Sequence, residues 1–139
     1  MQPADVAQEQ IIADFTLLSD WSERYAYIME LGQRLPVFPE VYRIPEYLVQ
    51  GCQSQVWFHV SAEEKKLHFD AVSDSMIVSG LIALLMKVYN DRSPEEILKI
   101  EPRFIEAIGL SQHLSPNRRN GLFSMLKRIH ELALQARTA

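Results

Sequence analysis

The stretch Met76–Tyr89 restricts the fold of this chain more than any other segment, because it is apolar almost all round. Ser79 and Lys87 are its main interruptions. A surface helix carries one polar face, whereas a helix that is hydrophobic on every side must be buried on most of them. The stretch is far shorter than the ~20 apolar residues of a membrane-spanning helix. We therefore expect a helix buried in the protein core, capped by Asp74 or Ser75.

Further helices are indicated by the helical spacing of apolar residues and by Ser-Pro pairs at helix starts. They are expected over residues 3–18, 21–35 and 102–109, and two more should begin at Ser93-Pro94 and Ser115-Pro116. Between Pro36 and Tyr47, three prolines and the lack of periodicity predict an irregular connection.

Two runs of alternating apolar and polar residues, 56–61 and 67–72, predict a β-hairpin. A symmetric turn centred between Glu63 and Glu64 would place these residues opposite each other: Phe58 and Phe69, Val60 and Leu67, and His59 and His68. Two facing histidines without a nearby acid or thiol are too few ligands, so no metal site is predicted. Helices, a small antiparallel sheet and more helices make an α+β fold, and the length suits one domain over residues 1–139.

The overall charge excludes some classes of function. The net charge is −4, whereas a nucleic-acid-binding protein normally shows a basic face. The N-terminal residues Met-Gln-Pro-Ala-Asp lack the basic and apolar regions of a signal peptide. We expect a cytoplasmic protein with no nucleic-acid partner and no membrane association.

Cys52 is the single cysteine of the chain. No internal disulfide can form, and one thiolate cannot hold an iron–sulfur cluster or a Cys-rich zinc site alone. Cys52 is therefore either an inert buried thiol or a working nucleophile. It follows Gly51 and precedes Gln53-Ser54-Gln55, just before the first predicted strand. This composition is typical of a loop, and loops on a rigid scaffold often present functional side chains.

A nucleophilic thiol could serve more than one kind of reaction. The thiolate is the reactive form, and exchange with another sulfur also requires access. A thiol hydrolase would need a histidine base as well. His113 and His130 are available, but neither lies in a local motif that supports this role.

Four segments, in order along the chain, resemble the SufE/CsdE family of sulfur acceptors, the Fe-S metabolism associated domain. The cysteine-bearing segment is Val49-Gln50-Gly51-Cys52-Gln53-Ser54-Gln55-Val56-Trp57. The others are Glu30-Leu31-Gly32-Gln33-Arg34-Leu35-Pro36, Ser79-Gly80-Leu81-Ile82-Ala83 and the segment from Gln112 to Leu122. The resemblance implies an antiparallel sheet of about three strands backed by helices, as in IscU-type scaffold proteins.

The resemblance also implies a role as a persulfide relay rather than a stand-alone enzyme. Family members take persulfide sulfur from a pyridoxal-phosphate-dependent cysteine desulfurase, stimulate that enzyme and pass the sulfur to an Fe–S scaffold complex. By position, Cys52 would carry the sulfur. The chain needs no cofactor of its own, because the pyridoxal phosphate belongs to the partner. Whether the partner is of the SufS or CsdA type, and whether the chain is a monomer or a weak homodimer, is left open.

The other candidate residues come from the loop and from the matched segments. Gly51, Gln53, Asp74, His113 and Arg118 are candidates for shaping the loop or contacting the partner. Asp74 is equally suited to cap the next helix, Arg118 to lie in solvent, and His113 to bind backbone. Family members often read Asp-Ser-Asp after the hairpin, whereas this chain reads Val72-Ser73-Asp74, which puts the role of the first acid in doubt. A regulatory module that binds a desulfurase without carrying sulfur is the alternative.

Overall fold

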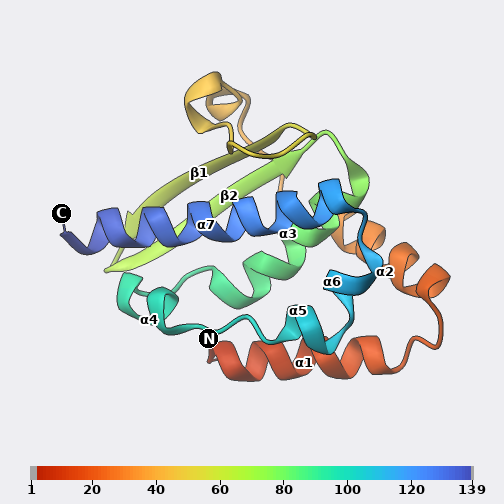
Figure 1. Ribbon diagram of the computed structural model, residues 1–139. Helices are drawn as coiled ribbons and strands as arrows, with labels where there is room; N and C mark the ends of the chain where they lie inside the picture. Colours follow the sequence, from red (N-terminus) through yellow and green to blue (C-terminus); the bar gives the residue numbers. More distant parts are fainter. Residues whose placement is uncertain (1–2, 139) are drawn as a thin grey trace.

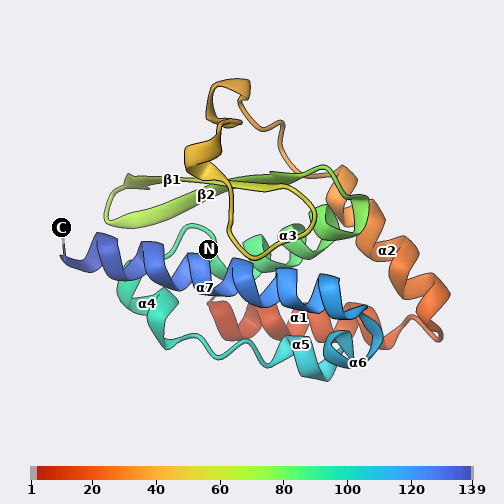
Figure 2. The ribbon, with the colours of Figure 1, turned by 45° about the horizontal axis from the view of Figure 1, so that its top comes forward.

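The computed structural model describes residues 3–138, and its helices and strands follow the expected α+β order (Figure 1). The elements are α1 (Ala4–Thr16), α2 (Trp21–Gln33), the 3-10 turns η1 (Glu40–Tyr42) and η2 (Pro45–Tyr47), β1 (Val56–Glu63), β2 (Lys66–Ser73), α3 (Met76–Tyr89), α4 (Pro94–Lys99), α5 (Phe104–Ala107), α6 (Leu110–His113) and α7 (Pro116–Thr138). The hairpin forms one layer, and the helices pack beneath it (Figures 1 and 2).

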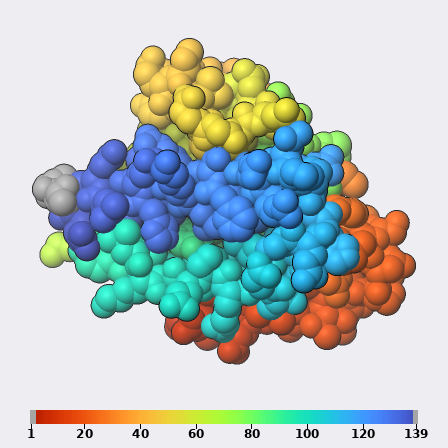
Figure 3. Space-filling model, in the orientation of Figure 1, coloured from red at the N-terminus to blue at the C-terminus, as the bar shows by residue number. Residues whose placement is uncertain are grey.

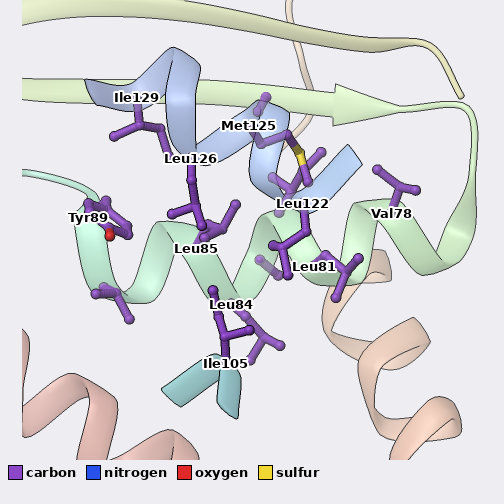
Figure 4. Close-up of a cluster of buried hydrophobic side chains, with 14 of the residues drawn as sticks. Val78, Leu81, Leu84, Leu85, Tyr89, Ile105, Leu122, Met125, Leu126 and Ile129 are labelled. Atoms are coloured by element: carbon purple, nitrogen blue, oxygen red, sulfur yellow. The ribbon is translucent and has the colours of Figure 1, made fainter. Parts of the chain in front are cut away.

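The expectation of a buried helix over Met76–Tyr89 is confirmed, with the same bounds. Helix α3 contacts α1, α2, α7 and β2, so apolar residues on nearly all its sides find a partner. Figure 4 shows Leu85 directed toward Leu126 of α7, while Leu84 approaches Ile105 of α5. Ser75 caps the helix, its Oγ accepting a hydrogen bond from the backbone N–H of Val78 at 3.3 Å.

Helices α2 and α3 approach so closely that their backbones touch at two glycines. A Cβ on Gly80 would lie 2.1 Å from the carbonyl oxygen of Ile28, and one on Gly32 would lie 2.6 Å from the backbone nitrogen of Gly80. No side chain can be accommodated at these distances without moving a helix. The two glycines therefore fix the separation of α2 and α3.

The predicted hairpin is confirmed, but the predicted register is wrong. The turn residues are Glu64 and Lys65, with φ of 52° and 65°, which is the left-handed conformation that both central residues of a type I′ turn require. The observed pairs are Phe58 with Ala71, His59 with Asp70, Val60 with Phe69 and Ala62 with Leu67. Each partner is shifted by two residues, so every side chain keeps its predicted face.

Within residues 3–138 the sheet has two strands, β1 and β2, rather than about three. A single bridge between Leu48 and Trp57 lies beside β1. At the outer edge of β2, Phe69 donates its backbone N–H to Oδ1 of Asn90 at 2.8 Å and accepts from Nδ2 of Asn90 at 3.1 Å. The backbone of Leu67 donates to the carbonyl of Arg92 at 2.8 Å. A side-chain amide and a short extended segment thus occupy the place of another strand.

The segment with the two 3-10 turns covers part of the outer face of the hairpin. The ring of Tyr42 stacks on His59 with centroids 3.6 Å apart, and Tyr47 meets the same imidazole edge to face. His68 lies apart from His59, with Nδ1 2.7 Å from a carboxylate oxygen of Asp91. The predicted facing of the two histidines is therefore wrong, because of the register shift.

The hydroxyl of Tyr89 is buried at the end of α3 and has no hydrogen-bond partner within residues 3–138. Burial raises the pKa of this phenol to about 12. An unsatisfied buried polar group costs about 1–3 kcal/mol.

We expect Tyr89→Phe to raise the free energy of unfolding by about 1 kcal/mol, measured by urea denaturation. The control is Tyr25→Phe, which removes a hydroxyl that donates to the carbonyl of His113 and should lower the free energy of unfolding. A decrease for Tyr89→Phe equal to that for Tyr25→Phe would contradict this prediction.

Candidate functional site

Cys52 lies in the loop of residues 50–55 that leads into β1, hereafter the Cys52 loop. Its base is closed by a hydrogen bond from the N–H of Val49 to the carbonyl of Val56 at 2.9 Å. The carboxylate of Asp74 accepts from the N–H of Gln55 at 3.1 Å. Asp74 therefore holds the loop instead of capping α3, where the following serine is the cap.

The tip of the Cys52 loop rests on α7. Oγ of Ser124 donates to the carbonyl of Gly51 at 3.3 Å, and the Cys52 thiol donates to the carbonyl of Gly121 at 3.7 Å. In Figure 3, the yellow part of the chain, which includes this loop, lies directly against the blue of α7. Gly51 has φ +88°, a left-handed conformation that glycine adopts readily and other residues do not.

A cavity of about 350 Å³ opens beside the thiol, between the loop and the start of α7. It is lined by Cys52, Gln53, Ser54, Ser75, Val78, Ser115, Asn117, Arg118 and Gly121. Most of these side chains are small or carry a hydroxyl or amide group, and Arg118 alone among these lining residues carries a charge. The cavity has room for an added sulfur atom and for the end of an approaching residue.

The environment of the thiol favours its protonated form. Cys52 is half-buried, and burial raises the pKa of its thiol above the ordinary value. The Gly121 carbonyl accepts from the S–H group, which also stabilises the neutral form. Because the thiolate is the nucleophile, this environment lowers the fraction of Cys52 in its reactive form.

The structure brings Gly51, Gln53 and Arg118 to the thiol, whereas His113 lies elsewhere. The ring of His113 stacks on Trp21 at 4.1 Å, and its Nδ1 lies 3.0 Å from the carbonyl of Gly109. It does not line the cavity beside Cys52. This geometry offers Cys52 no base from His113.

Sequence reasoning missed the contacts that α7 makes with the Cys52 loop. Gly121 was part of a matched segment, but nothing in the sequence indicated that its carbonyl faces the thiol. Ser124 is an isolated polar residue in an amphipathic helix, and it carries no signal of its contact with Gly51. Such contacts depend on how the loop and the helix meet in space.

Two further properties bear on the kind of site. Within residues 3–138, no group of three or more His, Cys, Asp or Glu side chains is arranged to hold a metal ion. In the same part of the chain, each helix is too short or too polar to cross a membrane.

The fold and the site together define a small α+β protein that presents one half-buried thiol on a loop docked against its last helix. The family model of SufE, the Fe-S metabolism associated domain, matches residues 9–133. The chain therefore belongs to the SufE family, which is associated with Fe–S metabolism. This confirms the resemblance found in the sequence.

Two relatives agree with this assignment, and a solved structure shares the fold. An uncharacterized SufE-like protein of Rhizobium meliloti is 46% identical over 126 residues, covering 87% of this chain and 90% of the relative. Another from Rhizobium etli is 43% identical over 130 residues, covering 90% and 88%. The solution structure of a hypothetical protein from Thermus thermophilus matches with a TM-score of 0.79 at 24% identity, covering 100% of both chains, and shows the shared fold.

Val72 stands where family members often carry an acid. In this chain it is half-buried and lies opposite Trp57 in the hairpin. Asp74, which is the acid of the family pattern that this chain retains, accepts a hydrogen bond from the N–H of Gln55 in the Cys52 loop. The loop is thus held without an acid at position 72.

Proposed function

We propose that this protein is a sulfur carrier that takes persulfide sulfur from a cysteine desulfurase onto Cys52. The observation that supports this most is the placement of the chain's single thiol, on a glycine-preceded loop at the mouth of a polar cavity, in a member of the SufE family. The partner would be a pyridoxal-phosphate enzyme of the SufS or CsdA type, and an Fe–S scaffold complex would receive the sulfur. The chain itself acts as a relay and as an activator of the desulfurase.

The transfer is a thiol exchange. The Cys52 thiolate attacks the terminal sulfur of the desulfurase persulfide, so that a new S–S bond forms at Cys52 while the old one breaks. The desulfurase cysteine leaves as a thiolate, and no net oxidation occurs. A thiol of the acceptor then attacks the terminal sulfur on Cys52 in the same way. Such chemistry requires a reduced thiol, which suits the cytoplasm.

A docked and a released position of the loop would suit two stages of this cycle. When docked, the thiol is half-buried and its pKa is raised, so stray reactions are slow. Binding of the desulfurase would draw the loop away from α7 and expose the thiol.

Sulfur loading is directly measurable. After incubation with a cysteine desulfurase and cysteine, we expect intact-mass spectrometry to show one added sulfur atom. After digestion, the added sulfur should be found on the peptide that contains Cys52. A reductant should remove it. Omitting cysteine should leave the mass unchanged. The absence of any sulfur adduct while the desulfurase turns over would refute the carrier function.

A further inference from the structure

Two contacts between the Cys52 loop and α7 differ in kind. The contact from Cys52 to Gly121 uses a thiol, which is a weak donor, at 3.7 Å. The contact from Ser124 to the Gly51 carbonyl uses a hydroxyl at 3.3 Å, and it ties down the residue next to the cysteine. The hydroxyl contact is therefore the stronger restraint on the tip of the loop.

The fit at this point is close as well as polar. A Cβ added to Gly51 would lie 2.6 Å from Oγ of Ser124. With φ at +88°, Gly51 turns its carbonyl toward the hydroxyl, and a side chain there would displace the hydroxyl from its present position. The rest of the loop is anchored at its base, by Val49 to Val56 and by Asp74 to Gln55. Movement of the thiol thus requires release of the tip from α7, while the base can stay in place.

We propose that Ser124 is a positioning residue that keeps the Cys52 loop docked on α7 and so controls how often the thiol is exposed. The role assigned to Ser124 rests on the proposed function and deepens it: release from Ser124 is the step that a desulfurase must promote. Without a partner, the hydroxyl limits the reaction of Cys52 with other electrophiles. The residue acts through the loop and does not touch the transferred sulfur.

The test is the alkylation rate of Cys52 by iodoacetamide in the full chain, recorded from pH 6 to 10. Ser124→Ala should speed alkylation at neutral pH about two-fold, because a long and exposed O–H···O contact lies at the weak end of the range for net hydrogen-bond contributions. Ser124→Thr keeps the hydroxyl and should restore a rate near that of the wild type. Ser22→Ala, at an exposed serine on α2, serves as the matched control. Equal rates for Ser124→Ala, Ser22→Ala and the wild type would overturn the proposal.

A general loss of stability is separated from loop release by hydrogen exchange. In Ser124→Ala, amides of α3 should keep the wild-type exchange rate while alkylation of Cys52 becomes faster. Faster exchange of the α3 amides would mean that the substitution loosens the whole fold, and would also overturn the proposal. Gly51→Ala offers a second route, since its Cβ would collide with Ser124, and it should increase alkylation as well.

Failure of this proposal is distinguishable from failure of the carrier function. Alkylation uses no desulfurase and reports on the loop alone. If Ser124→Ala leaves alkylation unchanged while Cys52 is loaded with sulfur, the carrier function stands and Ser124 has no positioning role. If the loop is released as expected but no variant accepts sulfur, the loop behaves as proposed and the carrier function fails.

Discussion

Replacing Cys52 by serine is expected to abolish sulfur uptake and the stimulation of desulfurase turnover, while the fold is retained. Serine has nearly the same shape as cysteine, but its hydroxyl cannot accept the terminal sulfur of a persulfide. The half-buried site tolerates the oxygen, which can still donate to the Gly121 carbonyl now bonded by the thiol. The desulfurase should therefore return to its basal rate, measured as alanine released from cysteine.

This variant also separates the carrier from a regulatory module. A protein that only binds the desulfurase and alters its rate would stimulate equally with cysteine or serine at position 52. Binding of Cys52→Ser to the desulfurase, measured by calorimetry, controls for loss of the complex. Stimulation by the serine variant at the wild-type level would contradict sulfur transfer as the basis of activation.

Gly80→Ala is expected to destabilise the protein severely, by about 3 kcal/mol or more, with a Tm lowered by roughly 10 °C. The added Cβ would lie 2.1 Å from the carbonyl oxygen of Ile28. The obstacle is backbone, not a flexible side chain, so α2 and α3 must separate. That separation would open the core around α3, which packs against four other elements. Thermal unfolding followed by circular dichroism measures the effect.

Gly121→Ala is the matched control for that experiment, because both glycines lie within helices. A Cβ at Gly121 would meet the Cys52 sulfur at 3.7 Å, an ordinary van der Waals contact. Alanine is preferred over glycine in a helix by about 0.5–1 kcal/mol, so stability should rise slightly. A loss for Gly121→Ala equal to that for Gly80→Ala would show that close approach of α2 and α3 is not the cause.

The sequence predicted the elements whose signal is local. Helix α3 has the predicted bounds because a segment with apolar residues on nearly all its sides is stable only when it is buried in the core. The faces of the hairpin were also correct, since alternation settles which side chains point inward. The predicted register failed at Glu64 and Lys65, because neither residue is typical of a turn in which both φ angles are positive.

The site was predictable at Cys52 and Gly51 but not at the surface that receives them. Asp74 was assigned two equal roles, and the three-dimensional structure shows that its carboxylate bonds the loop at Gln55. Ser124 is separated from Gly51 by most of the chain, so no local pattern joins them. Only the path of α7 under the hairpin brings the two residues into contact.

The amide of Asn90 has a consequence for how this protein behaves at high concentration. An exposed strand edge offers free N–H and C=O groups on which a neighbouring chain can assemble, and such edges are a common origin of aggregation. At Phe69 both groups are already taken by one side chain. A neighbouring copy of the protein therefore finds no free backbone group at this position of β2.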